Sequence, residues 1–338
     1  MIPGVFEMTE DPVPEIREDQ VLLKILYVGV CGSDLQHYHG LHPATRGHLP
    51  VVLGHEASAR VVRTGRAVKD FKEGELVVIE PQITCGHCFP CLQGRFNVCE
   101  HLKVLGAHEP GLLCEYFACD PGLLHHTPAG LDPRLAALAE PLAVGVGAVR
   151  RSRLLKGGNV AVIGAGTIGC CTAQAARHMG AGQILAADIN QAKLDYALEC
   201  GMDFAVNTAR EPLKDAVRRC FGSRGADVIM DCVASPAVFD SILDASRPSS
   251  EIIVTGNYKE PVKIELPRIQ RREVSLIGHM MYVREDFETA LELLASGKIN
   301  TDRLISSEWD LEDYPRALIY ADEHPMDVMK MMIRVGRE

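Results

Sequence analysis

The stretch Val160-Ala-Val-Ile-Gly-Ala-Gly-Thr-Ile-Gly169 joins an apolar run to a glycine loop of the form G-x-G-x-x-G. Its four apolar residues are typical of a buried strand, and the residues that follow the loop, up to Met179, favour a helix. Gly164 permits a tight turn, Gly166 lets the backbone approach a pyrophosphate, and Gly169 lets the helix pack on the strand. The stretch therefore predicts a strand, a loop and a helix whose N-terminus faces phosphate groups.

An acidic residue follows at the spacing that dinucleotide-binding units use. Asp188 stands nineteen residues after Gly169, directly after the apolar run Ile184 to Ala187, where a carboxylate can accept hydrogen bonds from a ribose diol. It would repel a 2′-phosphate, and Ile189-Asn190 supplies no arginine to receive one. NAD is therefore favoured over NADP; the alternative is that Asp188 only closes a turn. The expected cofactor-binding residues are Gly164, Gly166, Thr167, Ile168, Gly169 and Asp188.

The chain changes character at about Asn159. Residues 20–122 contain short β-branched runs cut by turn residues, which predicts a compact all-β domain. After Asn159, apolar runs such as Val228–Met230 and Ile252–Val254 alternate with helical stretches such as Lys193–Cys200. This alternation predicts an α/β domain with a parallel, doubly wound sheet.

Four cysteines fall within fifteen residues in the pattern C-x2-C-x2-C-x7-C. Turn-forming residues such as Gly86 and Pro90 separate them, so that four thiolates can close a tetrahedral Zn2+ site with no open position. The alternatives are a cysteine-rich loop or a pair of disulfides, which the absence of a secretory signal disfavours. The expected ligands of this structural zinc, in a lobe that spans residues 81–102, are Cys85, Cys88, Cys91 and Cys99.

A second set of metal-binding residue types lies outside this lobe. Cys31 follows an apolar run within Val-Gly-Val-Cys-Gly-Ser-Asp, and His55 and Glu56 follow Leu53-Gly54. A thiolate, an imidazole and a carboxylate are the mixed ligands of a zinc that keeps one position open for water or substrate. Lone cysteines and histidines are more often core or surface residues than ligands, so only the combination favours a catalytic zinc.

These motifs stand in one order across nearly the whole chain. From about Pro12 to about Asp302 the sequence resembles the zinc-dependent medium-chain dehydrogenase/reductases, and within them the sorbitol (polyol) and threonine dehydrogenase branch. The resemblance implies a GroES-like β-rich catalytic domain formed by residues 1–142 and 280–338, and a Rossmann domain formed by residues 143–279. Its cofactors would be two Zn2+ per chain and NAD.

The same resemblance adds a fourth candidate ligand to the catalytic zinc. Glu140, within Leu138-Ala-Glu-Pro-Leu142, stands where the family places its third or fourth ligand. Two carboxylates beside Cys31 and His55 would make a harder site than two thiolates. Whether Glu56 or Glu140 coordinates directly, with the other acting through a water, stays open.

The resemblance also implies a route by which the proton of the substrate hydroxyl reaches solvent. Ser33, two residues after Cys31, matches the Ser or Thr that serves the family as first relay, and helix capping is its alternative role. Asp34 is expected to support His55 rather than to act on substrate. The expected catalytic residues are Ser33, Glu56 and Glu140.

One departure from the family concerns the substrate pocket. Gln36 stands where many relatives have histidine, and an amide cannot shuttle a proton. Either water with His37 or His39 completes the relay, or the pocket binds a different substrate. Residues expected in the pocket are Gln36, Tyr116 and Tyr282, whereas His42 and His48 are expected in a solvated polar loop.

Composition limits the partners. Lys+Arg number 35 against 45 Asp+Glu, and the net charge of -10 disfavours nucleic acid or an anionic membrane as the main partner. Met1–Thr9 carries no secretory signal, and no run of eighteen apolar residues occurs. We expect a cytoplasmic protein with a small-molecule substrate, assembled as a homo-oligomer, either a tetramer or a dimer.

The sequence thus predicts an NAD-dependent zinc alcohol dehydrogenase that acts on a secondary hydroxyl or ketone of a polyol, sugar or sugar acid. The alternative is an amino-acid dehydrogenase similar to threonine 3-dehydrogenase, but those enzymes typically read C-G-T-D-x-H where this chain reads Cys31-Gly-Ser-Asp-Leu-Gln36. A non-catalytic relative that binds zinc and nucleotide would have lost catalytic ligands, and all of them are present here.

Overall fold

The computed structural model describes residues 4–45 and 50–336. The chain divides into two compact units, one formed by Met1–Glu140 with Ala290–Glu338 and the other by Pro141–Thr289. The second boundary falls within helix α10 (Arg284–Ala295) rather than after residue 279. The start of α10 belongs to the second unit because Asp286 accepts two hydrogen bonds from Arg150 there. Nowhere in the described parts of the chain is a helix long and apolar enough to cross a membrane.

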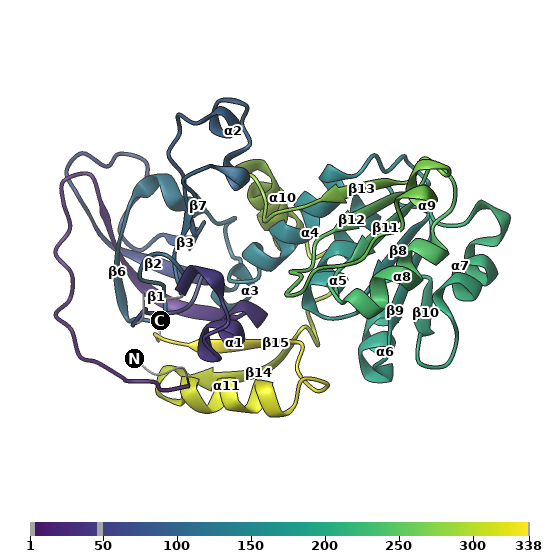
Figure 1. Cartoon of the computed structure of the whole chain (residues 1–338). Coiled ribbons are helices and arrows are strands. Elements are labelled where there is room, and N and C mark those ends of the chain that lie inside the picture. The colour runs from purple at the N-terminus through teal and green to yellow at the C-terminus, as the bar shows by residue number, and fades with distance from the viewer. Residues whose placement is uncertain (1–3, 46–49, 337–338) are drawn as a thin grey trace. The chain divides into compact units, whose positions relative to one another are not determined.

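The first unit is built on a seven-stranded sheet (Figure 1). Its strands follow the order β14-β15-β1-β2-β3-β7, and β6 also pairs with β1. The pairs are antiparallel except β14 with β15, which are parallel. The strands are β1 (Val21–Val30), β2 (Glu56–Thr64), β3 (Leu76–Ile79), β6 (Tyr116–Cys119), β7 (Leu124–His126), β14 (Ile305–Asp310) and β15 (Lys330–Arg334).

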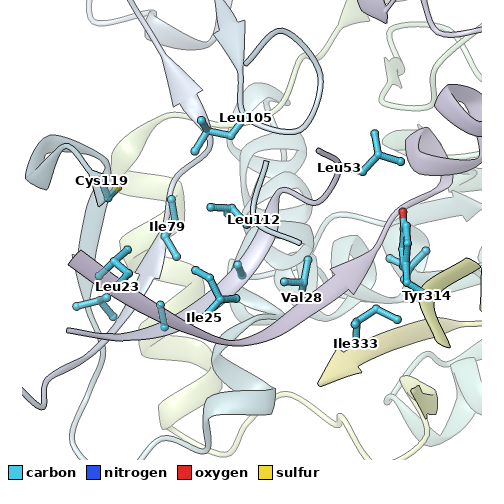
Figure 2. Close-up of a cluster of buried hydrophobic side chains, with 14 of the residues drawn as sticks. Leu23, Ile25, Val28, Leu53, Ile79, Leu105, Leu112, Cys119, Tyr314 and Ile333 are labelled. Carbon is cyan, nitrogen blue, oxygen red and sulfur yellow. The ribbon is translucent and has the colours of Figure 1, made fainter. Parts of the chain in front are cut away.

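The core of the first unit is filled from both parts of the chain that form it. Figure 2 shows Leu23, Ile25 and Val28 of β1 among side chains from other strands and loops, including Ile79 and Leu112. These five side chains are each at most 1% exposed, and burial of a side chain of this size contributes about 1.5–3 kcal/mol. The C-terminal segment supplies Tyr314 and Ile333 to the same cluster. Its return to this core explains why the first unit is discontinuous.

Shorter elements complete the first unit. The four-cysteine segment contains the helix α2 (Phe89–Leu92) and is flanked by β4 (Gln82–Ile83) and β5 (Lys103–Val104), which pair with each other. The remaining helices of this unit are α1 (Gly32–Tyr38), α3 (Pro133–Ala136) and α11 (Tyr314–Glu323). The first two residues of α4 (Ala139–Arg151) also belong to it. Its 3-10 turns are Pro43–Thr45, Phe96–Val98, Pro121–Leu123 and Leu311–Asp313.

The second unit contains a six-stranded parallel sheet in the order β10-β9-β8-β11-β12-β13. The expected doubly wound α/β fold is thereby confirmed. Its strands are β8 (Val160–Ile163), β9 (Ile184–Asp188), β10 (Phe204–Asn207), β11 (Val228–Asp231), β12 (Glu251–Val254) and β13 (Ser275–Gly278). The helices that connect them, drawn around the sheet in Figure 1, are α5 (Thr167–His178), α6 (Gln191–Glu199), α7 (Leu213–Phe221), α8 (Pro236–Ala245) and α9 (Leu266–Gln270), with a 3-10 turn at Gly222–Arg224.

The strand order fixes where this unit can bind a ligand. The chain runs from β8 outward to β10 on one side, then returns to β11 beside β8 and runs outward to β13. Such a reversal opens a crevice at the carboxyl ends of the two central strands, and ligands of doubly wound sheets bind there. In this chain the strand order reverses between β8 and β11, so such a crevice is expected at the carboxyl ends of these two strands.

Candidate functional site

The four cysteines of the zinc lobe come together. The ligand atoms of Cys85, Cys88, Cys91 and Cys99 all lie within 4.8 Å of one another. The Sγ of Cys99 lies 3.5 Å from that of Cys85 and 3.8 Å from that of Cys88, close to the spacing of about 3.8 Å that a tetrahedron with Zn–S bonds of about 2.3 Å requires. All four are free thiols. The donor set and its geometry therefore fit one Zn2+.

Backbone donors support the same reading. The N–H of Cys88 donates to the Sγ of Cys85 at 3.3 Å, and the N–H groups of Cys85 and His101 donate to the Sγ of Cys99 at 3.4 Å and 3.3 Å. Such bonds stabilise the thiolate form, which is the form that ligates a metal.

A second cluster forms where β1 and β2 meet. Cys31 follows the last residue of β1 and caps α1, His55 directly precedes β2, and Glu56 is the first residue of β2. Their three ligand atoms lie within 4.8 Å of one another. A thiolate, an imidazole and a carboxylate in this arrangement leave a fourth position of a tetrahedral zinc free.

The surroundings of His55 carry negative charge. Burial lowers the pKa of His55, but the hydrogen bond to Cys31 and the charges of Asp34 and Glu140 outweigh burial and raise that pKa well above its usual value. Asp34 is 1% exposed, accepts a 2.8 Å hydrogen bond from the Cys31 N–H through Oδ2, and has Oδ1 3.8 Å from the His55 Nδ1. A field that favours a positive charge at His55 also favours a bound cation.

Glu56 has a partner that the sequence reading missed. The Nζ of Lys330 lies 2.7 Å and 2.6 Å from the two carboxylate oxygens of Glu56 and donates to the Val30 carbonyl at 2.8 Å. Both side chains are almost completely buried. A signal existed, since Lys330 is the single charged residue in the apolar run Val328-Met-Lys-Met-Met-Ile333.

Glu140 lies in the first turn of α4 and is 6% exposed. Its charge contributes to raising the pKa of His55 and of Lys330. Its oxygen is not among the three ligand atoms that lie within 4.8 Å of one another. Of the two glutamates, Glu56 is therefore the nearer to Cys31 and His55.

The candidate proton-relay residues on α1 differ in burial. Ser33 and Gln36 are half-buried on this helix. His37 is buried with its ring centroid 3.9 Å from that of His42, and burial, followed by the charges of His42, His55 and His108, lowers the pKa of His37 to about 3. A neutral His37 cannot store a proton near neutral pH.

The outer histidines of this segment have other surroundings. His39 is exposed, and its Nε2 lies 3.0 Å from Oδ1 of Asp322, so it pairs at the surface. His42 is half-buried against His37 and accepts the Ala44 N–H at 3.2 Å, so it is not the freely solvated residue that the sequence suggested. His48 lies outside the described residues.

The two tyrosines expected in the pocket, Tyr116 and Tyr282, lie in different units. Tyr116 pairs with Lys24 in the sheet, seven residues before Cys31 on β1, which is roughly 20 Å along a strand. Tyr282 is 0% exposed and its ring packs edge-on against Phe287 at 5.3 Å, inside the second unit. The burial of Tyr282 was not evident from its position in the sequence.

The glycine loop lies at the end of β8 with room in front of it. Gly164 has φ +96, a conformation that disfavours other residues. A Cβ at Gly169 would collide with the Gly164 carbonyl, whereas one at Gly166 would meet nothing within 4 Å. Gly166 is the N-cap of α5 and offers no side chain to the first N–H groups of that helix. A pyrophosphate fits this open helix N-terminus, which Thr167 and Ile168 begin.

Asp188 ends β9 and contacts the glycine loop directly. Its Oδ2 accepts the Ala165 N–H at 2.7 Å and its Oδ1 accepts the Asn190 N–H at 2.9 Å. The side chain is half-buried, and the hydrogen bonds given for the described residues use one lone pair of each oxygen. The turn-closing role and the ribose-binding role are therefore compatible.

Two family sequence models match the chain. The alcohol dehydrogenase GroES-like domain matches residues 17–129, and the zinc-binding dehydrogenase domain matches residues 167–296. The first match spans β1 to β7 of the first unit, and the second begins at the N-terminus of α5.

Curated relatives align over nearly the whole chain. A sorbitol dehydrogenase of Halalkalibacterium halodurans is 34% identical over 93% of this chain and 92% of that protein. An L-galactonate-5-dehydrogenase of Escherichia coli K12 is 31% identical over 96% of this chain and 92% of that protein.

Solved structures share the fold. A zinc-binding dehydrogenase of Sinorhizobium meliloti bound to NADP superimposes with a TM-score of 0.90 at 28% identity, covering 99% of this chain and 97% of that one. A short chain alcohol dehydrogenase of Escherichia coli CFT073 complexed with NADH superimposes with a TM-score of 0.91 at 25% identity, covering 98% and 97%.

Replacing Cys91 with serine tests the closed cysteine site. We expect the variant to lose about one zinc ion per chain and to melt more than about 5 °C lower, since a structural zinc contributes folding free energy. Metal analysis and calorimetry measure both quantities. Cys114→Ser, at a half-buried thiol outside both clusters, is the matched control. A Cys91→Ser protein that keeps its zinc and melts like the wild type would refute the assignment.

Replacing Lys330 with methionine tests the buried ion pair. An uncompensated Glu56 should lower the free energy of unfolding by about 3–5 kcal/mol, as removal of one partner of a buried pair does. The double variant Lys330→Met/Glu56→Gln should recover part of that loss because the unpaired charge is gone. Urea denaturation of the wild type and both variants, with the zinc content of each measured alongside, provides the comparison. Equal stability of Lys330→Met and wild type would show that the pair is not formed.

Proposed function

Because the chain belongs to the zinc-dependent medium-chain dehydrogenase/reductases, in their polyol dehydrogenase branch, we propose that it oxidises a secondary hydroxyl of a polyol, sugar or sugar acid with NAD and reduces the ketone in reverse. The observation that carries this proposal is the Cys31–His55–Glu56 cluster, which offers three ligand atoms and leaves a fourth position. Bound zinc would polarise the substrate oxygen, and the nicotinamide ring would take or give the hydride.

We assign the metal site to Cys31, His55 and Glu56, with Glu140 farther out. The Lys330 ammonium offsets the charge of Glu56, so that the remaining negative charge near the metal comes from the Cys31 thiolate together with Asp34 and Glu140. Glu140 adds a second carboxylate that can hold a water or exchange with Glu56. The four-cysteine site would hold the second zinc and stabilise its lobe.

Ser33 is the proposed first group to receive the proton. It follows Cys31 by two residues and is half-buried on α1. The neutral, buried His37 and the surface pair of His39 with Asp322 do not favour a histidine as the next step. Water that reaches Ser33 is then the simplest route to solvent.

The substrate class rests on the relatives and on Gln36. The named relatives act on sorbitol and on L-galactonate, and both substrates are rich in hydroxyl groups. An amide such as that of Gln36 can donate and accept hydrogen bonds without charge, which suits such a substrate. The threonine-type alternative would need a group for an ammonium, and a panel that includes threonine distinguishes the two.

We propose a homo-oligomer, with a tetramer favoured over a dimer. A tetramer with two kinds of two-fold interface needs two self-complementary surfaces. The second unit ends its sheet at β13, near which Leu276 and Met280 are 37% and 48% exposed. The zinc lobe exposes Phe89 and Leu92 by 72% and 71%. Light scattering that gives the mass of one chain would contradict this proposal.

We also propose a cytoplasmic location. None of the twelve cysteines, all of which lie within the described residues, forms a disulfide, and thiols persist in a reducing compartment. Fractionation that recovers the protein with a secreted or membrane fraction would contradict it.

A substrate panel tests the proposed activity. The purified zinc-loaded protein, supplied with NAD and polyols, aldonates, inositols or threonine, should form NADH with at least one hydroxyl-rich substrate. Cys31→Ala should lower kcat/KM by more than about 100-fold, beyond the range that loss of an outer-shell partner produces, while the fold and the second zinc persist. Cys114→Ser should retain activity. Full activity of Cys31→Ala without its zinc would refute the mechanism.

Cofactor choice depends on one side chain. We expect wild-type kcat/KM with NAD to exceed that with NADP by roughly 100-fold, since Asp188 repels a 2′-phosphate. Asp188→Ala with Ile189→Arg should move the ratio toward NADP, while Asp195→Ala, at an exposed position on α6, should not. Asp188 also accepts the Ala165 N–H, so its replacement should weaken the binding of both cofactors. The readout is therefore the ratio of kcat/KM with NAD to kcat/KM with NADP. A wild-type enzyme that uses NADP at least as well would contradict the assignment.

A further inference from the structure

A buried carboxylate stands on the other side of the crevice from the glycine loop. Asp231 is the last residue of β11 and is 0% exposed. Its Oδ2 accepts a 2.6 Å hydrogen bond from the Tyr258 hydroxyl, and its Oδ1 accepts the N–H groups of Val233 and Ala234 at 3.1 Å each. Three donors therefore satisfy a carboxylate that water does not reach.

The loop that these bonds hold is strained. Ala234 has φ +57, a left-handed conformation that is unfavourable for a residue with a Cβ. Such strain persists only where the surroundings enforce it. Here the Asp231 side chain binds the Ala234 N–H, and Gly256 packs so closely that a Cβ there would lie 2.7 Å from the Cβ of Ala234.

A second loop is tied to the same residue. The N–H groups of Thr255 and Gly256 donate to the Asp231 carbonyl at 3.0 Å and 2.9 Å. Tyr258, two residues further on, is half-buried with its ring edge-on to Phe239 at 6.4 Å. Asp231 thus joins the segments that follow β11 and β12.

The loop formed by residues 232–234 lies against the glycine loop that starts at Gly164. A Cβ on Gly164 would be 2.8 Å from the Cγ2 of Val233, so the loop after β11 contacts the turn that precedes α5. The crevice at which the strand order reverses lies between these two loops. Displacement of residues 232–234 would therefore alter the space in front of the glycine loop.

We propose that Tyr258 is a positioning residue for the dinucleotide: through Asp231, its hydroxyl holds residues 232–234 as one wall of the crevice into which the pyrophosphate binds. This inference rests on the proposed function, since it requires that a nicotinamide dinucleotide bind at Gly164–Gly169. The Tyr258 hydroxyl is the one donor to Asp231 Oδ2 given by the described hydrogen bonds. Without it the carboxylate can turn, and Ala234 can leave its strained conformation.

Tyr258→Phe tests the inference because it removes one oxygen atom and keeps the ring. We expect the Kd for NADH, measured by fluorescence titration, to rise roughly tenfold, the loss typical of a hydrogen bond to a charged group. Hydrogen exchange of residues 232–236 in the cofactor-free protein should quicken in the variant. Tyr320→Phe, in the first unit, is the matched control and should change neither quantity.

The outcomes separate this inference from the proposed function. If the wild-type protein binds neither NADH nor NADPH, the proposed function itself fails. If it binds NADH and Tyr258→Phe binds it with the same Kd and the same exchange rates, Tyr258 has no positioning role. A lower melting temperature with an unchanged Kd would likewise overturn the inference, because it would show a contribution to stability alone.

Discussion

The buried pair of Glu56 with Lys330 is the constraint on which the first unit depends. Removing two charges from water costs several kcal/mol each, and only their mutual contact and further hydrogen bonds offset that cost. Here Lys330 begins β15, Glu56 begins β2, and the ammonium also binds the carbonyl of Val30, the last residue of β1. The Lys330 ammonium therefore links the ends of β1, β2 and β15. Cys31 and His55 adjoin two of these three ends, those of β1 and β2.

The second unit also contains a buried ionisable side chain beside its expected binding site, that of Asp231. Asp231 lies at the end of a central strand, and donors from two loops surround its carboxylate. In both units a buried ionisable group lies beside the site and fixes the backbone that shapes it. Cys31, His55 and Asp188 are half-buried, whereas Lys330 and Asp231 are buried.

Much of this architecture follows from local sequence patterns. The strand expected at Val160–Ile163 forms with those bounds, and the apolar runs Val228–Met230 and Ile252–Val254 lie within β11 and β12. Patterns of this kind are local, so periodicity and spacing reveal them. Local patterns do not reveal contacts between residues that are distant in sequence. Lys330 is 274 residues from Glu56, and the burial of Tyr282 depends on packing against Phe287. Such pairings, and the surface role of His39, needed the folded chain.

The central claim is that one chain carries two zinc sites of different chemistry, and X-ray absorption at the zinc edge of the purified protein tests it most directly. Four thiolates at one site and one at the other predict two zinc ions per chain with about 2.5 sulfur neighbours each on average, at about 2.3 Å, and the rest of the shell nitrogen and oxygen. A single zinc per chain surrounded by four sulfurs, or two zinc ions with only nitrogen and oxygen neighbours, would contradict the account.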